Sequence, residues 1–276
     1  MRTLFLSLLS GLATFALVSV ASSVSSAQSP QVEKDIPYLG KDRQETGDLY
    51  LPAERKPGTK SPAVLIIHGG GWTGGSKRAG REQNIGKTLT EHGMVGFSID
   101  YKLGERGNAM GAWPQNLHDC KTAVRWLRVN AEKYGIDPDR IGVIGGSAGG
   151  HLSSLIAVTQ EKDGLDPKAP WGDVSTQVRC VVDLYGPIAV RGDQDGATAI
   201  TKYLDKNDPP FLIMHGTKDT TVPVATSEKL SEAVKAAGIE QELVIIEGAP
   251  HTFHLQPKQQ DLRPTVMAFF KKHLLK

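Results

Sequence analysis

Short apolar runs alternate with stretches of helical periodicity along most of the chain. The runs carry polar residues mainly at their ends, which is typical of strands buried on both faces of a parallel sheet. They are Ala63–Ile67, Val95–Ile99, Ile141–Ile144, Val181–Tyr185, Phe211–Met214 and Leu243–Ile246. Two earlier segments, Asp35–Tyr38 and Asp48–Leu51, are expected to form an antiparallel edge. These eight runs predict an α/β fold built on a mainly parallel sheet.

Apolar residues at intervals of three or four positions predict helices between the strands. One such stripe consists of Leu117, Cys120, Val124, Leu127 and Ala131. Pro114 stands where the first turn of that helix is expected, a position that proline tolerates. Further helices are predicted over His151–Thr159, Val224–Ala237 and Arg263–Leu275. No repeat, low-complexity tract or linker interrupts the pattern, so we interpret residues 28–276 as a single domain with helices on both faces of the sheet.

The first 27 residues have the pattern of a secretory signal peptide. Arg2 is charged, residues 4–20 are mostly apolar, and residues 25–27 offer small side chains for cleavage before Gln28. An uncleaved membrane anchor is the alternative, but the apolar stretch is short for a span and contains serine, threonine and glycine. We therefore expect a secreted protein, periplasmic or extracellular, with no stable membrane anchor after cleavage.

Composition narrows the classes of function. The chain has 276 residues, and its 32 lysines and arginines against 30 aspartates and glutamates give a formal net charge of +2, without a basic run. Binding of nucleic acid through phosphate neutralisation is therefore not expected. Its two cysteines, Cys120 and Cys180, exclude a small domain built on disulfides. A disulfide between them is one interpretation, but both suit small buried side chains and we expect free thiols.

The first candidate for chemistry is Gly-Gly-Ser-Ala-Gly at 145–149, which matches G-x-S-x-G. It follows a predicted strand and precedes a predicted helix, which is the setting of a nucleophile elbow. Glycines on both sides of Ser147 allow the sharp turn and the close approach of neighbouring backbone. A glycine-rich turn without catalytic role is the alternative.

The second candidate is His-Gly-Gly-Gly-Trp at 68–72, after another predicted strand. Successive glycines allow several backbone N–H groups to point at one spot, as an oxyanion hole requires. A phosphate-binding loop is disfavoured because Gly75-Ser76-Lys77 has the wrong order for a Walker motif. The glycines also match a dinucleotide-binding motif literally. However, polar residues follow them where that motif needs an apolar helix, and only Asp100 could serve as its acidic residue, so this interpretation is disfavoured as well.

Together these segments resemble the α/β-hydrolase superfamily, specifically esterases and lipases of the branch with acetyl-xylan and feruloyl esterase-like carbohydrate esterases. The resemblance covers nearly the whole chain after residue 35. It is carried by Asp48–Pro52, His68–Trp72, Asp100-Tyr101, Gly145–Gly150, Tyr185–Pro187, Pro209–Asp219, Val222-Pro223 and His251. It implies no metal or organic cofactor.

The resemblance also implies a catalytic triad in the order serine, acid, histidine. Ser147 is the implied nucleophile, Asp219 the acid and His251 the base, and each follows the end of a predicted strand. The implied oxyanion donors are the N–H groups of Ala148, Gly70 and Gly71, and Trp72 is a candidate wall of the acyl pocket or a core aromatic.

Other residues compete for these roles. Asp183, at a strand end, is an alternative acid, and His254 an alternative base for which a surface position is the simpler interpretation. His68 and His215 are expected to brace loops through hydrogen bonds, and His151 to serve in packing or at the rim.

The stretch Ile188–Pro209 is only 22 residues long, where relatives commonly insert a larger cap. A short or absent cap predicts an open site, and therefore a small-molecule or polysaccharide ester as substrate, with short acyl groups preferred. Two other functions stay open: a serine peptidase of the same fold, and a non-catalytic binding protein derived from a hydrolase.

Overall fold

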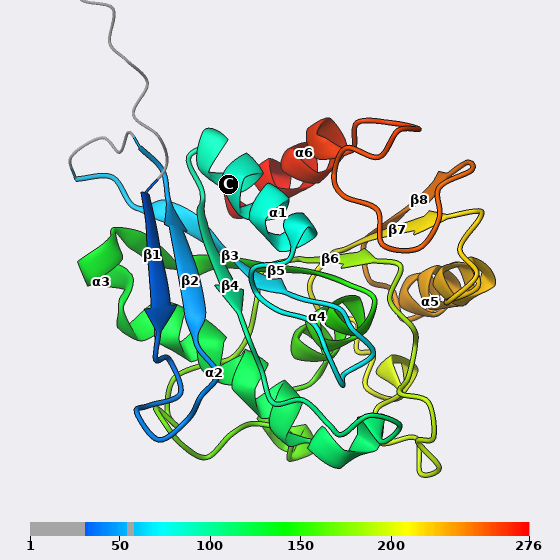
Figure 1. Cartoon of the computed structure of the whole chain (residues 1–276), viewed down its shortest axis with the longest axis horizontal. Coiled ribbons are helices and arrows are strands. Elements are labelled where there is room, and N and C mark those ends of the chain that lie inside the picture. Colours follow the sequence, from blue (N-terminus) through cyan, green and yellow to red (C-terminus); the bar gives the residue numbers. More distant parts are fainter. Residues whose placement is uncertain (1–30, 54–57, 276) are drawn as a thin grey trace, which may run out of the picture.

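The computed structural model describes residues 31–53 and 58–275 and contains one eight-stranded sheet (Figure 1). In chain order the strands are β1 (Gln31–Ile36), β2 (Gly47–Leu51), β3 (Ser61–Ile67), β4 (Val95–Ile99), β5 (Ile136–Gly146), β6 (Val181–Leu184), β7 (Phe211–Gly216) and β8 (Gln241–Ile246). Across the sheet their order is β1-β2-β4-β3-β5-β6-β7-β8. Only the pairings β1–β2 and β2–β4 are antiparallel. The predicted mainly parallel sheet with an antiparallel edge is confirmed.

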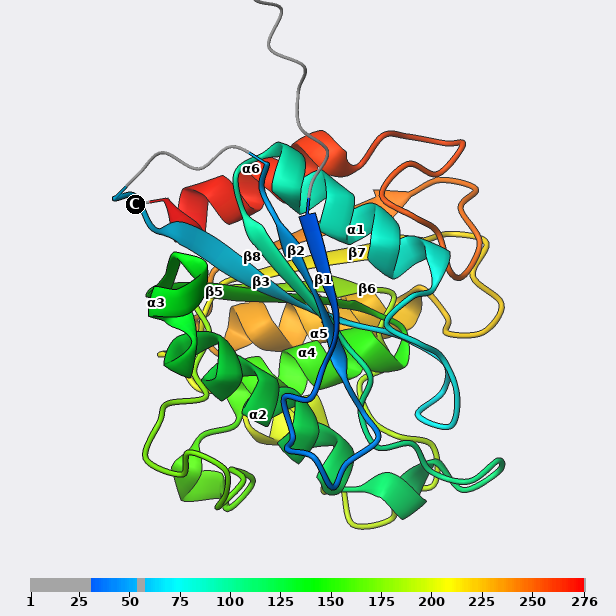
Figure 2. The ribbon, with the colours of Figure 1, turned by 60° about the vertical axis from the view of Figure 1, so that its left-hand side comes forward.

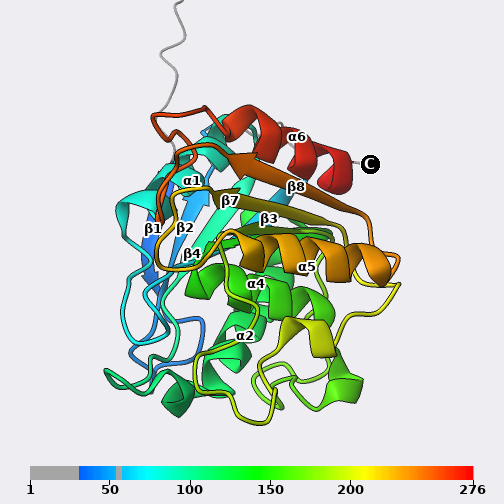
Figure 3. The ribbon, with the colours of Figure 1, turned by 90° about the vertical axis from the view of Figure 1, so that its right-hand side faces the viewer.

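Helices cover both faces of this sheet. One face carries α1 (Gly80–Glu91) and α6 (Arg263–Leu274), and the other carries α2 (Gln115–Val129), α3 (Ala131–Tyr134), α4 (Ala148–Val158) and α5 (Ala225–Ala236) (Figure 2, Figure 3). Short 3-10 turns occupy η1 (Ala109–Ala112), η2 (Glu161–Asp163) and η3 (Ile200–Lys202). The buried apolar residues accordingly form two clusters, one on each face of the sheet.

The two cysteines show how strictly the sheet separates these clusters. Cys120 belongs to the cluster under α2, and Cys180 to the cluster under α1 and α6. Both are buried free thiols, as expected. Burial raises the pKa of both thiols above the ordinary range of cysteine.

Three elements differ clearly from the sequence prediction. The first edge strand was predicted over Asp35–Tyr38, but β1 begins four residues earlier, because Gln31 already pairs with Leu51 of β2 although the strand is mostly polar. The helix α1 was not predicted, because only Ile85 and Leu89 mark its buried side in an otherwise polar stretch. Strand β5 begins at Ile136, five residues earlier than predicted, since Ile136 pairs with Ser61 although polar residues and a proline follow it.

The predicted signal peptide lies outside the described residues. Within the described part of the chain, no helix has the length and apolar character needed to cross a membrane.

Parallel strands bring their following loops to one edge of the sheet. Ser147 follows β5, Asp219 follows β7 and His251 follows β8, so all three lie beyond carboxyl ends. The glycine-rich loop after β3 opens at the same edge, because β3 pairs in parallel with β5. The carboxyl edge is where open α/β sheets place their ligands.

Candidate active site

The turn between β5 and α4 holds Ser147 in a conformation that few side chains adopt. Its φ is +58°, in the left-handed region, and its N–H donates to the carbonyl of Leu184 at 2.8 Å. A Cβ at Gly145 would lie 2.3 Å from the carbonyl oxygen of Gly149, and one at Gly149 would lie 2.1 Å from that of Ile67. Glycine is therefore required on both sides, and the segment has the geometry of the predicted elbow.

The three residues of the predicted triad lie in hydrogen-bonding contact. Ser147 Oγ donates to His251 Nε2 at 3.0 Å, and His251 Nδ1 donates to Asp219 Oδ2 at 2.6 Å. The His251 side chain is 13% exposed and that of Asp219 is fully buried. This arrangement can move a proton from the serine to the imidazole and hold the resulting imidazolium beside a carboxylate.

Asp219 is held in its ionised form by the donors around it. Burial acts to raise its pKa, but the hydrogen bonds from His251 and from the N–H groups of Val222 and Thr221 outweigh burial and keep the pKa below the usual value. The other carboxylate oxygen, Oδ1, receives both backbone bonds, so Oδ2 stays directed at the histidine.

His215 braces this acid loop, as predicted. Its Nε2 donates to the carbonyl of Val222 at 2.8 Å and lies 3.1 Å from Asp219 Oδ2, and Ser227 Oγ bonds its Nδ1 at 2.6 Å. Burial lowers the pKa of His215, which favours the neutral ring.

Asp183, the alternative acid, points elsewhere. Its carboxylate accepts from Ser154 Oγ at 2.9 Å and from the N–H of Gly186 at 2.8 Å, beneath the start of α4. Burial raises its pKa to about 6. The alternative base, His254, is exposed. The geometry therefore favours Asp219 and His251 over both alternatives.

The glycine loop after β3 contains two successive residues in backbone conformations that favour glycine. Gly70 and Gly71 have φ values of +123° and +60° and are exposed. Its base is fixed by His68, whose Nδ1 donates to the Gly69 carbonyl at 2.7 Å, while Tyr101 Oη donates to the His68 carbonyl at 2.9 Å. Ala148 begins α4, so its N–H is one of the helix's free terminal donors. Oxyanion binding by these groups stays a prediction.

Trp72 and His151 lie against each other beside this loop. Trp72 is buried among core residues and meets the His151 ring edge-on, with 5.3 Å between centroids. His151 is fully buried in packing and its Nε2 donates to the carbonyl of Thr198 at 2.9 Å. Trp72 is thus placed chiefly as a core aromatic, and its contact with an acyl group stays a prediction.

The segment between β6 and β7 forms a short loop instead of a cap domain. Its only described regular element is η3. Asp193 accepts hydrogen bonds from the N–H groups of Ala197 and Thr198 and from Thr198 Oγ1, which folds the loop on itself. Together with its bond to His151, this holds the loop against α4 and leaves Ser147 partly exposed.

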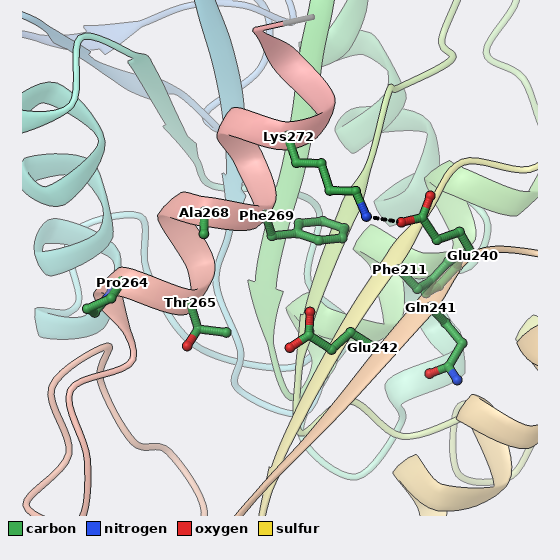
Figure 4. A pocket seen from close by; sticks show the side chains of 9 residues that line it. All are labelled: Phe211, Glu240, Gln241, Glu242, Pro264, Thr265, Ala268, Phe269 and Lys272. Atoms are coloured by element: carbon green, nitrogen blue, oxygen red, sulfur yellow. Dashed lines mark hydrogen bonds and ion pairs between the residues drawn. The ribbon is translucent and has the colours of Figure 1, made fainter.

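A separate hollow lies at the opposite edge of the sheet (Figure 4). It has a volume of about 640 Å³ and lies between the first residues of β7 and β8, Phe211 and Gln241, and one side of α6 from Pro264 to Lys272. Lys272 and Glu240 form an ion pair at its rim. Because the candidate triad follows the last residues of those strands, this hollow is not part of the site. In the described ranges, no group of His, Cys, Asp or Glu side chains is arranged to hold a metal ion.

Two residues that contact the site were not predicted from the sequence. Arg81 reaches the elbow from α1, and Tyr185, noted only as part of a motif, packs against His251. The polar stretch around Arg81 gave no signal, because α1 itself was not predicted.

The sheet order and the position of the elbow after β5 make this protein an α/β-hydrolase. Comparison with known families gives the finer assignment: residues 47–198, more than half of the chain, match the BD-FAE family, and the chain belongs to it. Residues 188–276 also match the prolyl oligopeptidase family.

Similar proteins of known name are esterases. Esterase LipQ of Mycobacterium tuberculosis is 31% identical in an alignment of 229 positions that covers 74% of this chain and 53% of LipQ, so the chain spans about half of that relative. A solved truncated carbohydrate esterase from gut microbiota superposes with a TM-score of 0.80 at 25% identity, covering 91% of this chain and 99% of the other. A propionate-bound esterase of Thermogutta terrifontis gives 0.73 at 28%, covering 90% and 95%.

Proposed function

We propose that this protein is a carboxylic-ester hydrolase that works through Ser147, His251 and Asp219. The observation that carries the proposal is the continuous hydrogen-bonded line from Ser147 Oγ through His251 to Asp219 at the carboxyl edge of the sheet. The named esterases among its relatives support it.

In this mechanism Ser147 Oγ attacks the ester carbonyl while His251 Nε2 takes its proton. The oxyanion that forms is bound by the N–H groups of Ala148 and of Gly70 or Gly71. His251 then gives the proton to the departing alcohol, which leaves an acyl group on Ser147, and water activated by His251 releases the acid. Asp219 stabilises the imidazolium in both halves of the reaction.

The substrate we propose is a short-chain, acetyl-type ester, including acetyl groups on plant polysaccharides. The short loop over 188–209 supports this, because a site without a cap domain, with Ser147 partly exposed, suits an ester with a bulky alcohol group. We also propose that residues 1–27 direct secretion and are removed. N-terminal sequencing of the mature protein from its host should begin at Gln28, and a sequence that still contains residue 10 would contradict this proposal.

The test of activity is hydrolysis of p-nitrophenyl acetate together with labelling by a fluorophosphonate probe. We expect turnover and labelling by the native chain, and loss of both in Ser147→Ala. A native chain that binds substrate but neither turns it over nor reacts with the probe would indicate a binding protein instead.

Peptidase activity is a second candidate, because residues 188–276 match the prolyl oligopeptidase family. An aminoacyl p-nitroanilide measured beside the matching p-nitrophenyl ester separates the two. We expect a much higher kcat/KM for the ester, relative to the spontaneous rates, and a preference for the anilide would establish the peptidase.

A further inference from the structure

A largely buried chain of hydrogen bonds joins α1 to the loop that carries His251. Arg81 Nη1 donates to Tyr185 Oη at 2.8 Å, and Tyr185 Oη donates to the backbone carbonyl of Phe253 at 3.0 Å. Because arginine has only donors, the phenol oxygen must accept from Arg81, and its single hydrogen is then directed at Phe253. Burial raises the pKa of Tyr185 to about 12, so the phenol keeps that hydrogen.

The ring of Tyr185 is packed directly against the candidate base. It meets the His251 ring with 4.8 Å between centroids at 60° and the Phe253 ring at 4.5 Å and 78°. Its backbone has a φ of +46°, a costly conformation for an aromatic residue. The hydrogen bond from its N–H to the Met214 carbonyl, at 2.8 Å, helps to hold it there.

Arg81 touches the other side of the site. A Cβ at Gly146 would lie 2.6 Å from Arg81 Nη1, and one at Gly69 would lie 3.3 Å from Nη2, so the guanidinium occupies the space that these glycines leave. Glu82, which is fully buried, accepts from Arg81 Nε at 2.9 Å and from Nη2, and balances its charge.

We propose that Arg81 and Tyr185 are positioning residues that fix the His251 ring relative to Ser147. Arg81 lies against the backbone before the nucleophile and, through Tyr185, holds the backbone two residues after the base. His251 must reach Ser147 and Asp219 at once, and a displacement of 1 Å in such a site can lower the rate by about 10². The proposal rests on the proposed function, since it concerns the same reaction.

The first test is Tyr185→Phe, which keeps the ring and removes the hydroxyl. We expect kcat for p-nitrophenyl acetate to fall by about 10 to 10², with KM within about twofold, because substrate contacts are unchanged. Fluorophosphonate labelling of Ser147 should slow in parallel. The matched control is Tyr38→Phe: Tyr38 is also fully buried, and its hydroxyl donates to the Asp100 carbonyl at 2.6 Å. It should lose comparable thermal stability but keep the native kcat.

The second test removes the arginine without leaving Glu82 as an unpaired buried charge, which would threaten folding. The variant Arg81→Met/Glu82→Gln should also lower kcat, and the loss in the variant with all three changes should be smaller than the product of the two separate losses, because both variants break the hydrogen bond between Arg81 and Tyr185.

Native kcat in a folded Tyr185→Phe protein, a loss confined to KM, or losses that multiply in the combined variant would each overturn the positioning role. If the native chain is active and the variants give any of these three results, only the positioning role is overturned, and the proposed function is retained. A native chain without turnover or labelling would overturn the function and this role together.

Discussion

At the scale of single residues, the site depends on how each ionisable side chain is surrounded. Asp183 lies in β6 and Asp219 in the loop after the neighbouring β7, and both side chains are buried, yet their pKa values shift in opposite directions. Asp219 receives a histidine and two backbone donors, whereas Asp183 receives one hydroxyl and one backbone donor, too few to offset its burial. The difference separates a carboxylate suited to hold an imidazolium from one that has a structural role.

The candidate triad can be tested residue by residue. Ser147→Ala should lower kcat by up to ~10⁶, and a Ser147→Ala/His251→Ala double variant should be little worse, because these groups act as a unit. Asp219→Asn should lower kcat by about 10⁴, since the amide favours the wrong imidazole tautomer. Steady-state kinetics with circular dichroism as the folding control measures both. A larger loss of kcat in Asp183→Asn than in Asp219→Asn would overturn the assignment of the acid.

Asp183 itself should weaken the native state as pH rises. Its folded pKa of about 6 exceeds the usual 3.8, so between these values the unfolded chain releases a proton that the folded chain keeps. The free energy of unfolding should therefore fall between pH 4 and pH 6 by about 3 kcal/mol, and stay lower above that range.

Asp183→Asn removes the group that titrates and with it this dependence of stability on pH, and the amide oxygen of the asparagine can still accept from the N–H of Gly186. The free energy of unfolding of Asp183→Asn minus that of the native chain, measured by urea unfolding, should therefore be larger at pH 8 than at pH 4.5. The exposed Asp173→Asn serves as the control and should show no such trend. A relative stability of Asp183→Asn that is independent of pH would contradict the argument.

The residues of the triad could be predicted because each stands in a short motif after an apolar strand. Ser147 lies between glycines, and Asp219 and His251 follow runs with clear β character. Arg81 could not be predicted, since its role depends on the space left by Gly146 and Gly69, which comes from the packing of α1 against two loops distant in sequence. No local pattern records such a contact.

At the scale of elements, the buried strands were the most predictable part of the fold. Apolar runs such as Phe211–Met214 appear in the structure within two residues of their predicted ends. Prediction failed where polar residues are structural: α1 has a buried Glu82 in its first turn, and β5 starts in a segment with Asp137 and Pro138. In both cases the element is stabilised by contacts with residues distant in sequence or by buried polar groups, which a hydrophobic pattern does not reveal.

Where β3, β5 and α4 meet, a side chain in place of glycine should destabilise the fold. In Gly149→Ala the new Cβ would lie 2.1 Å from the Ile67 carbonyl oxygen and 2.7 Å from that of His68, and neither backbone group can rotate away. We expect a loss of at least 1–3 kcal/mol in the free energy of unfolding and a large loss of kcat, because α4 must shift with Ser147.

Gly80→Ala is the matched control at another helix start. Its Cβ would meet only the exposed His254 ring, at 3.3 Å, and that side chain can move. Thermal unfolding and kinetics of the two variants should therefore differ clearly. Equal stability of both would show that the elbow adapts to a methyl group.

At the scale of the whole molecule, the loops of the candidate triad lie at one edge of the sheet, and the segment over 188–209 beside them is a short loop without a cap domain. A large lid excludes water and favours small or lipid substrates. A site without a lid excludes less water around the reacting groups but is accessible to larger substrates. The loop over 188–209 folds on itself through Asp193 and Thr198 and is fastened to α4 through His151. It is therefore built as a fixed rim of the site.

A fixed rim and an open site predict a substrate preference that can be measured directly. Acetyl esters should be cleaved faster than acyl chains of eight or more carbons, and acetylated xylo-oligosaccharide should release acetate, without activation at an oil–water interface. The decisive comparison is kcat/KM for acetylated xylo-oligosaccharide against an emulsified long-chain triglyceride. Ser147→Ala is the control for non-enzymatic release in both assays. If the triglyceride is the better substrate, or if activity rises sharply above its solubility limit, then the 188–209 loop must move as a lid and the protein acts as a lipase.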